Sequence, residues 1–148
     1  MPYASLVVGT DGSGTAEQAV RAAAEVAGSH GARLLIVSAY DVDEPPARNP
    51  GVDPAATGGP ASFRAAAEGA AARGLAVAGA TGTVRAEARA EVGPAAETLL
   101  AAAEAEGADL IVVGSRGMSG AARLTMGAVA GTISHLAACD VLIVHTSG

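Results

Sequence analysis

The sequence predicts an α/β fold built on a doubly wound, parallel sheet of five strands with four helices. Short apolar, β-branched runs alternate with alanine-rich stretches of helical period along the chain. Four of the five runs are apolar almost throughout, as expected of strands that helices cover on both faces. Strands and helices that alternate in this way join through right-handed crossovers into a parallel sheet.

Five strands are expected in order along the chain. The third run alternates imperfectly with charged residues, which predicts a more exposed strand near an edge of the sheet. The expected strands span Ser5–Gly9, Leu34–Ser38, Thr83–Arg89, Leu110–Val113 and Val141–Val144.

The first two helices are expected on either side of the second strand. The first has a capping box of Thr15 and Gln18, and Gly31 suits the left-handed residue after its end. Its apolar stripe consists of Ala16, Ala19, Val20, Ala23 and Ala27. The second helix runs from about Ser62 to Ala80 and ends at Gly82.

The last two helices flank the fourth strand. The third opens with Gly93 and Pro94, because proline is suited to the first helical position, and closes at Gly107. Its expected buried face comprises Ala96, Leu99, Leu100 and Ala103. The fourth starts near Gly127, and its expected buried face comprises Val129, Ile133, Leu136 and Ala137.

The segment Asp41–Pro60 interrupts this alternation. It contains five of the seven prolines and four acidic residues, which predicts a long, mobile surface loop before the second helix. The rest of the chain has no fixed-period repeat and no second composition regime. Residues 1–148 are therefore expected to form one domain.

Composition excludes several functions. The net charge is −6 and all nine basic residues are arginine, which excludes a lysine Schiff base and a P-loop lysine. The chain has no basic run, so no nucleic-acid partner is expected. The single cysteine and three histidines show no metal-ligand spacing. Without a signal peptide or a membrane-spanning apolar run, a soluble, cytoplasmic protein is predicted, with no membrane partner.

The segment after the fourth strand is the first candidate binding site, because ligands on doubly wound sheets bind beyond the carboxyl ends of the strands. Gly114, Gly117 and Gly127 leave backbone amides unobstructed there. The amides of 127–130 would lie at the N-terminus of the fourth helix, a natural phosphate site. Alternatively, the glycines only turn the loop and pack the helix. Arg116 and Arg123 would either meet phosphate oxygens or remain solvated.

Asp11 follows the first strand and is the second candidate. Its carboxylate would accept a hydrogen bond from a ribose hydroxyl, or hold a divalent cation against phosphates. Alternatively, it satisfies free amides at the start of the first helix, and the two roles are compatible.

These residues resemble the universal stress protein (UspA) family. The spacing Gly114-x2-Gly117-x9-Gly127 is similar to that family's nucleotide motif. The opening from Val7 to Ser13 and the ending from Cys139 to His145 are similar to its first and last strands. Gly107 to Gly117 matches as well. The resemblance covers the whole chain except the proline-rich segment.

The resemblance implies a Rossmann-like sheet of the adenine nucleotide alpha hydrolase type, in the order 3-2-1-4-5, and a homodimer paired through the last strand. It implies binding of ATP, with Gly9, Thr10 and Asp11 beside adenine and ribose. The backbone of Ala39 would read the adenine edge. The ribose and phosphates would lie against Gly114, Gly117, Gly127, Ala128, Val129 and Ala130.

The chain departs from the family pattern at Ala128 and Ala130, where relatives carry hydroxyl residues, and at Asp140, where many carry proline. Two side-chain donors to phosphate are missing, each worth about 0.5–1.5 kcal/mol, whereas the backbone donors remain. The chain is similar to small actinobacterial members of the family, a branch associated with cyclic AMP. That ligand needs fewer donors, so the departures favour a smaller adenine nucleotide without excluding ATP and its Mg²⁺.

Three functions follow from this reading. The first is a regulatory or sequestering dimer that binds an adenine nucleotide in a stress response. The second is a family member that binds no nucleotide and serves in dimerisation and protein contacts. The third is a slow ATPase, which is disfavoured because the glycine loop lacks a carboxylate or histidine to orient water. No catalytic residue is assigned.

Overall fold

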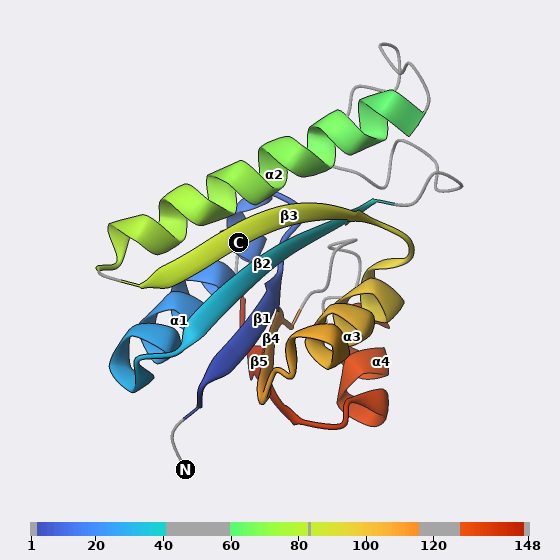
Figure 1. The fold of residues 1–148 in the computed structure, drawn as a ribbon. Helices are drawn as coiled ribbons and strands as arrows, with labels where there is room; N and C mark the ends of the chain where they lie inside the picture. Colours follow the sequence, from blue (N-terminus) through green and yellow to red (C-terminus); the bar gives the residue numbers. More distant parts are fainter. Residues whose placement is uncertain (1–2, 41–59, 83, 116–127, 147–148) are drawn as a thin grey trace.

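The computed structural model describes residues 3–40, 60–82, 84–115 and 128–146, and for residues 60 and 61 the backbone alone. In this part of the chain, strands and helices alternate as the sequence predicts. The elements are β1 (Ser5–Gly9), α1 (Gly14–His30), β2 (Arg33–Tyr40), α2 (Pro60–Ala80), β3 (Arg85–Val92), α3 (Ala95–Glu106), β4 (Leu110–Gly114), α4 (Ala128–Leu136) and β5 (Asp140–Val144). The strands form one parallel sheet in the order β3-β2-β1-β4-β5 (Figure 1).

Helices cover both faces of the sheet, with α1 and α2 on one side and α3 and α4 on the other. Side chains of the central strands therefore alternate between two buried layers. Leu6 and Val8 of β1 belong to the α1–α2 layer, whereas Val7 belongs to the α3–α4 layer. Both sets must be apolar, which explains the continuous apolar runs in the sequence. The predicted fold class and strand order are confirmed.

The two edges of the sheet differ in character. At one edge, β3 alternates between exposed and half-buried residues, as its charged sequence predicts. At the other edge, β5 is exposed at Asp140 and half-buried from Val141 to Val144. Leu142 and Val144 pack against the α1–α2 layer and Val141 and Ile143 against the α3–α4 layer, so β5 is covered on both faces, but less completely than the central strands. Among the described residues no strand lies beyond β5, so one of its sides lacks a neighbour.

Two strands reach further toward the carboxyl edge of the sheet than the sequence predicts. β2 continues to Tyr40 and β3 to Val92, while β3 begins at Arg85 rather than Thr83. The N–H of Gly93 donates to the Tyr40 carbonyl at 2.7 Å, which extends the pairing by one residue. At their carboxyl ends, β2 and β3 therefore extend beyond the end of β1.

The core is thin because alanine fills much of it. α1 lies on the sheet through Ala19, Ala23 and Ala27, which are fully buried. A Cβ atom at Gly74 of α2 would lie 3.0 Å from Ile36 Cγ2. Small side chains therefore let both helices approach the strands closely, and a larger residue at these positions would force them apart.

Two helix starts differ from the sequence prediction. Ser13, not Thr15, is the N-cap of α1, and its Oγ accepts from the Ala16 N–H at 3.2 Å. Pro94 is the N-cap of α3 rather than its first helical residue. The helix ends agree with the prediction, because Gly31 and Gly107 adopt left-handed backbone conformations at φ +66° and +61°.

The buried face of α4 is narrower than predicted. Ala130 and Ile133 are buried and Val129 is half-buried, but Leu136 is 66% exposed. Leu136 is the last residue of α4, so no further turn of the helix covers its side chain. The predicted loop Asp41–Pro60 lies outside the described residues except at Pro60, which is the first residue of α2 and not part of a loop. No helix in the described ranges combines the length and apolar character that crossing a bilayer requires.

Candidate functional site

The chain leaves β1 through Thr10, whose side chain supports the turn. Thr10 is 1% exposed, and its N–H donates to the Val37 carbonyl at 3.0 Å. Its Oγ1 accepts from the Gly12 N–H at 3.1 Å. The hydroxyl oxygen of Thr10 is thus hydrogen-bonded within the turn, and the buried Thr10 supports the turn that carries the predicted site residue Asp11.

Asp11 fulfils the structural role that the sequence left open. Its Oδ1 accepts from the Ser13 N–H at 2.9 Å, which holds Ser13 in place as the cap of α1. Within the described ranges, Oδ2 accepts no hydrogen bond from the protein. One carboxylate oxygen therefore orders the loop, while the other remains available to a ligand hydroxyl or a cation.

Ala39 presents its backbone where β1 has already ended. Gly9, the last residue of β1, is in register with Val37, and the Val37 carbonyl points toward the β1 side, because it accepts from Thr10. The Tyr40 carbonyl points the opposite way and accepts from Gly93 on the β3 side. Because successive residues of a strand point their backbone groups to alternate sides, the N–H and C=O of Ala39 point toward the β1 side. They lie beyond Gly9, the last residue of β1. They have the orientation needed to read the edge of a planar base.

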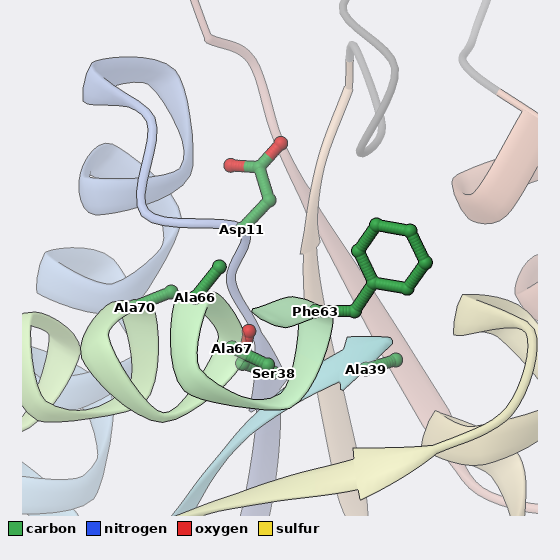
Figure 2. A pocket seen from close by; sticks show the side chains of 7 residues that line it. All are labelled: Asp11, Ser38, Ala39, Phe63, Ala66, Ala67 and Ala70. Atoms are coloured by element: carbon green, nitrogen blue, oxygen red, sulfur yellow. The ribbon is translucent and has the colours of Figure 1, made fainter. Parts of the chain in front are cut away.

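A first, small cavity adjoins these groups. We call it the α2 cavity. It is lined by Asp11, Ser38, Ala39, Phe63, Ala66, Ala67 and Ala70. Figure 2 shows that Asp11 and Phe63 are its large side chains, because the others are serine and alanine. Small residues of α2 thus leave room beside the end of β2, with a carboxylate and an aromatic ring on its walls.

A second small cavity lies where the winding of the sheet reverses, between β1 and β4. We call it the switch-point cavity. It is lined by Gly9, Thr15, Ala16, Leu99, Val113, Gly114, Val129 and Thr146. The end of β1 contributes to both cavities, since Gly9 lines this one and Asp11 the other. Open doubly wound sheets bind ligands at this position.

The N-terminus of α4 borders the switch-point cavity at Val129. α4 spans Ala128–Leu136, so the amides of Ala128, Val129 and Ala130 have no helical partner among the described residues. The Ala130 side chain is fully buried in the α3–α4 layer, which leaves only its backbone for a ligand. The predicted site residues Arg116, Gly117 and Gly127, together with Arg123, lie outside the described residues.

Sequence reasoning missed Phe63, Thr15 and Thr146, all of which line the two cavities. Thr146 follows the last strand, so the rule that sites form at the carboxyl ends of strands also applied to it. Phe63 is the first aromatic residue of α2, and no spacing motif marks it. Only the folded arrangement of α2 over β2 brings Phe63 to the cavity.

Charged side chains are few among the described residues around the two cavities. Of the described residues that line them, Asp11 alone is charged. The guanidinium of Arg73, on α2, lies against Gly12 in the turn after β1. Across the described ranges, no group of three His, Cys, Asp or Glu side chains is placed to hold a metal ion.

Comparison with known proteins identifies the family. The model of the universal stress protein family matches residues 2–145. The chain belongs to this family. It is 37% identical over 148 residues to universal stress protein Rv1636 of Mycobacterium tuberculosis (strain ATCC 25618 / H37Rv), covering 98% of each chain. A universal stress protein of Thermus aquaticus is 34% identical over 143 residues, covering 97% of this chain and 99% of its own.

Solved structures of universal stress proteins have the same fold. A universal stress protein crystallised in complex with cAMP matches with a TM-score of 0.76 and 33% identity, covering 99% of this chain and 100% of its own. The family assignment by resemblance in the sequence is therefore confirmed. The complex with cAMP gives the ligand of that relative and not the ligand of this chain.

Proposed function

We propose that this universal stress protein binds an adenine nucleotide, cAMP or ATP, and acts as a regulatory or sequestering homodimer in the stress response. The bound base would lie against the backbone of Ala39 and the α2 cavity. The phosphate would lie in the switch-point cavity, against Gly114 and the first turn of α4. Gly9 to Asp11 would contact the ribose between them.

One observation carries this proposal. The carboxyl edge of the sheet brings together three features that an adenine nucleotide requires. They are outward-facing backbone groups at Ala39 for the base, a free carboxylate oxygen at Asp11 for ribose, and a helix N-terminus at Ala128 for phosphate. They adjoin two cavities that share the end of β1. A relative of 33% identity was crystallised in complex with cAMP, which supports the same ligand class.

The donors that remain favour a ligand with a small anionic group. Ala128 and Ala130 supply backbone amides but no hydroxyl. Loss of two hydroxyl donors weakens the binding of a triphosphate more than that of a single phosphodiester, because the triphosphate has more charge to satisfy. We therefore propose tighter binding of cAMP than of ATP. Mg²⁺ would accompany ATP alone, held by its phosphates and by the Asp11 carboxylate.

The proposed dimer forms through β5. β5 carries the apolar run Val141–Val144, whereas β3 at the opposite edge carries alternating charges that discourage pairing. The Val144 carbonyl accepts from the Ser115 N–H and so faces β4. The backbone groups of Val141 and Ile143 therefore face outward, free to pair with a second copy.

Isothermal titration calorimetry of the full chain with cAMP and ATP tests the nucleotide proposal. We expect saturable binding of both, with the lower Kd for cAMP. Asp11→Asn keeps the hydrogen bond to Ser13 and removes the charge, so it serves as the matched variant for ribose recognition. We expect it to weaken binding about 3- to 10-fold. The absence of heat with either nucleotide at millimolar concentration would refute the proposal and favour a family member that binds no nucleotide.

A further inference from the structure

Thr146 is a buried polar residue that neither the family motif nor the nucleotide proposal uses. It follows β5 directly and is 3% exposed. It lines the switch-point cavity together with Gly9, Gly114 and Val129. A buried threonine therefore lies at the wall of the space proposed for the phosphate.

The main chain, not the hydroxyl, holds Thr146 in this position. The N–H of Thr146 donates to Ser115 Oγ at 3.1 Å, and the N–H of Ser115 donates to the Val144 carbonyl at 2.8 Å. These two bonds tie the segments that leave β4 and β5. The Thr146 hydroxyl is 3.5 Å from Ser115 Oγ, which is a long separation for two hydroxyl groups. The hydroxyl is thus fixed in place but only weakly engaged by the part of the chain that the structure describes.

We propose that Thr146 is a phosphate-binding residue of the nucleotide site, donating its hydroxyl hydrogen to the phosphate of the bound nucleotide. This inference rests on the proposed function. The hydroxyl would replace part of what the chain lacks at Ala128 and Ala130. A buried hydroxyl is neutral, so its burial is less costly than that of a charge, and a hydrogen bond to an anionic oxygen is stronger than one to a neutral group. Ser115 would keep Thr146 oriented whether or not the nucleotide is bound.

A packing role is the competing explanation, because the other branch of the side chain also makes a close approach. Thr146 Cγ2 lies 3.1 Å from the position that a Cβ would take at Gly114. The methyl and the hydroxyl can be separated by substitution. Thr146→Val retains the shape and removes the hydroxyl, whereas Thr146→Ser retains the hydroxyl and removes the methyl.

Calorimetry on both full-length variants decides between the two roles, with cAMP and adenosine as ligands. We expect Thr146→Val to weaken cAMP binding about 10-fold and to leave adenosine, which has no phosphate, within about 2-fold of wild type. Thr146→Ser recovers cAMP binding to within about 3-fold of wild type. Thr81→Val is the matched control, because Thr81 donates to Ala78 at the end of α2 and precedes β3 at the opposite edge of the sheet.

Three results would overturn the proposal. In the first, Thr146→Val binds cAMP as tightly as wild type. In the second, Thr146→Val loses affinity for cAMP and for adenosine equally. In the third, Thr146→Ser loses as much affinity for cAMP as Thr146→Val does. Thermal unfolding of each variant shows whether a loss of affinity reflects a loss of folding. A wild-type protein that binds neither ligand is a different result, because it refutes the proposed function itself.

Discussion

Gly114 illustrates how a residue of a binding motif can be required for packing. Its backbone is not in the left-handed region, so conformation alone does not demand glycine. A Cβ there would meet Thr146 Cγ2 at 3.1 Å and Ala19 Cβ at 3.9 Å. The added side chain would thus crowd Thr146 in the segment after β5. It would affect the cavity only by displacing Thr146.

Gly114→Ala is therefore expected to weaken nucleotide binding by displacing Thr146. The double variant Gly114→Ala/Thr146→Ser removes the methyl that the new Cβ meets, so it is expected to recover both affinity and thermal stability. Each forced contact of this kind costs about 1–3 kcal/mol. Calorimetry and thermal unfolding of the single and double variants measure the effect. If the double variant binds no better than Gly114→Ala, the methyl is not the cause.

Asp140, where the resemblance to the family implies proline, takes part in a link between the N-terminal segment and the sheet. The Tyr3 hydroxyl donates to Asp140 Oδ2 at 2.8 Å, while Asp109 accepts from the N–H groups of Ala4 and Ser5. Two carboxylates thus fasten the segment before β1 to the start of β5 and the turn before β4. The hydrogen bond to Asp140 raises the pKa of Tyr3, with smaller contributions from desolvation and from the charges of both carboxylates.

Asp140→Asn is expected to lower the pKa of Tyr3 toward its ordinary value of about 10. Since the folded protein raises this pKa, the stabilisation from neutral Tyr3 is present below pH ~10 and is lost as the pH rises through the folded value. Ultraviolet titration of tyrosinate in a Tyr40→Phe background isolates Tyr3. An unchanged titration curve in Asp140→Asn would show that the hydrogen bond does not control this pKa.

At the scale of elements, the sequence predicts best what buried side chains determine. β1, β2 and β4 were predictable because Val7 and its neighbours must satisfy two apolar layers at once. The ends of elements were less predictable, because they depend on hydrogen bonds across the chain. Tyr40 remains in β2 because its carbonyl accepts from Gly93, which periodicity within β2 does not reveal.

The site follows the same division. Strand ends and glycine spacing mark Gly9, Asp11 and Gly114 in the sequence, and these residues line the two cavities. Phe63 and Thr146 were not predictable, since each reaches its cavity through the packing of an element distant in sequence. The exposed position of Leu136 was likewise hidden, because the apolar period continues to the last residue of α4.

The start of α1 provides a test of the corrected cap. Ser13→Ala removes the acceptor for the Ala16 N–H and is expected to destabilise the protein by about 1 kcal/mol. Thr15→Ala removes a hydroxyl 3.2 Å from Ser13 Oγ but no acceptor of a helix amide, so its effect should be smaller. Urea unfolding of both variants measures the difference. An equal or larger loss in Thr15→Ala would restore Thr15 as the cap.

At the scale of the whole molecule, the two sheet edges predict how copies assemble. β3 presents Arg85, Glu87, Arg89 and Glu91, and Arg89 forms ion pairs with Glu91 at 3.5 Å and with Glu106 at 3.0 Å. Charges of this kind protect an edge from pairing. β5 offers an apolar edge instead, so a dimer through β5 would extend the sheet while β3 remains an outer edge.

Ile143→Pro is expected to convert the proposed dimer to a monomer, because it removes an outward-facing N–H that the partner strand would need. Ile143→Ala is the matched control, since it shortens the side chain and keeps the N–H. Light scattering coupled to size-exclusion chromatography gives the mass of each. A wild-type monomer, or a dimer that persists in Ile143→Pro with native circular dichroism, would exclude pairing through β5.

The account depends most on where a nucleotide binds, and amide chemical-shift mapping of the full chain with cAMP tests this directly. It predicts saturable shifts at the carboxyl edge of the sheet, led by Gly9, Asp11, Ala39, Gly114 and Val129. No shift at millimolar cAMP would contradict the account. Shifts confined to the amino-terminal ends of the strands, in the groove lined by Arg33 and Arg85, would also contradict it.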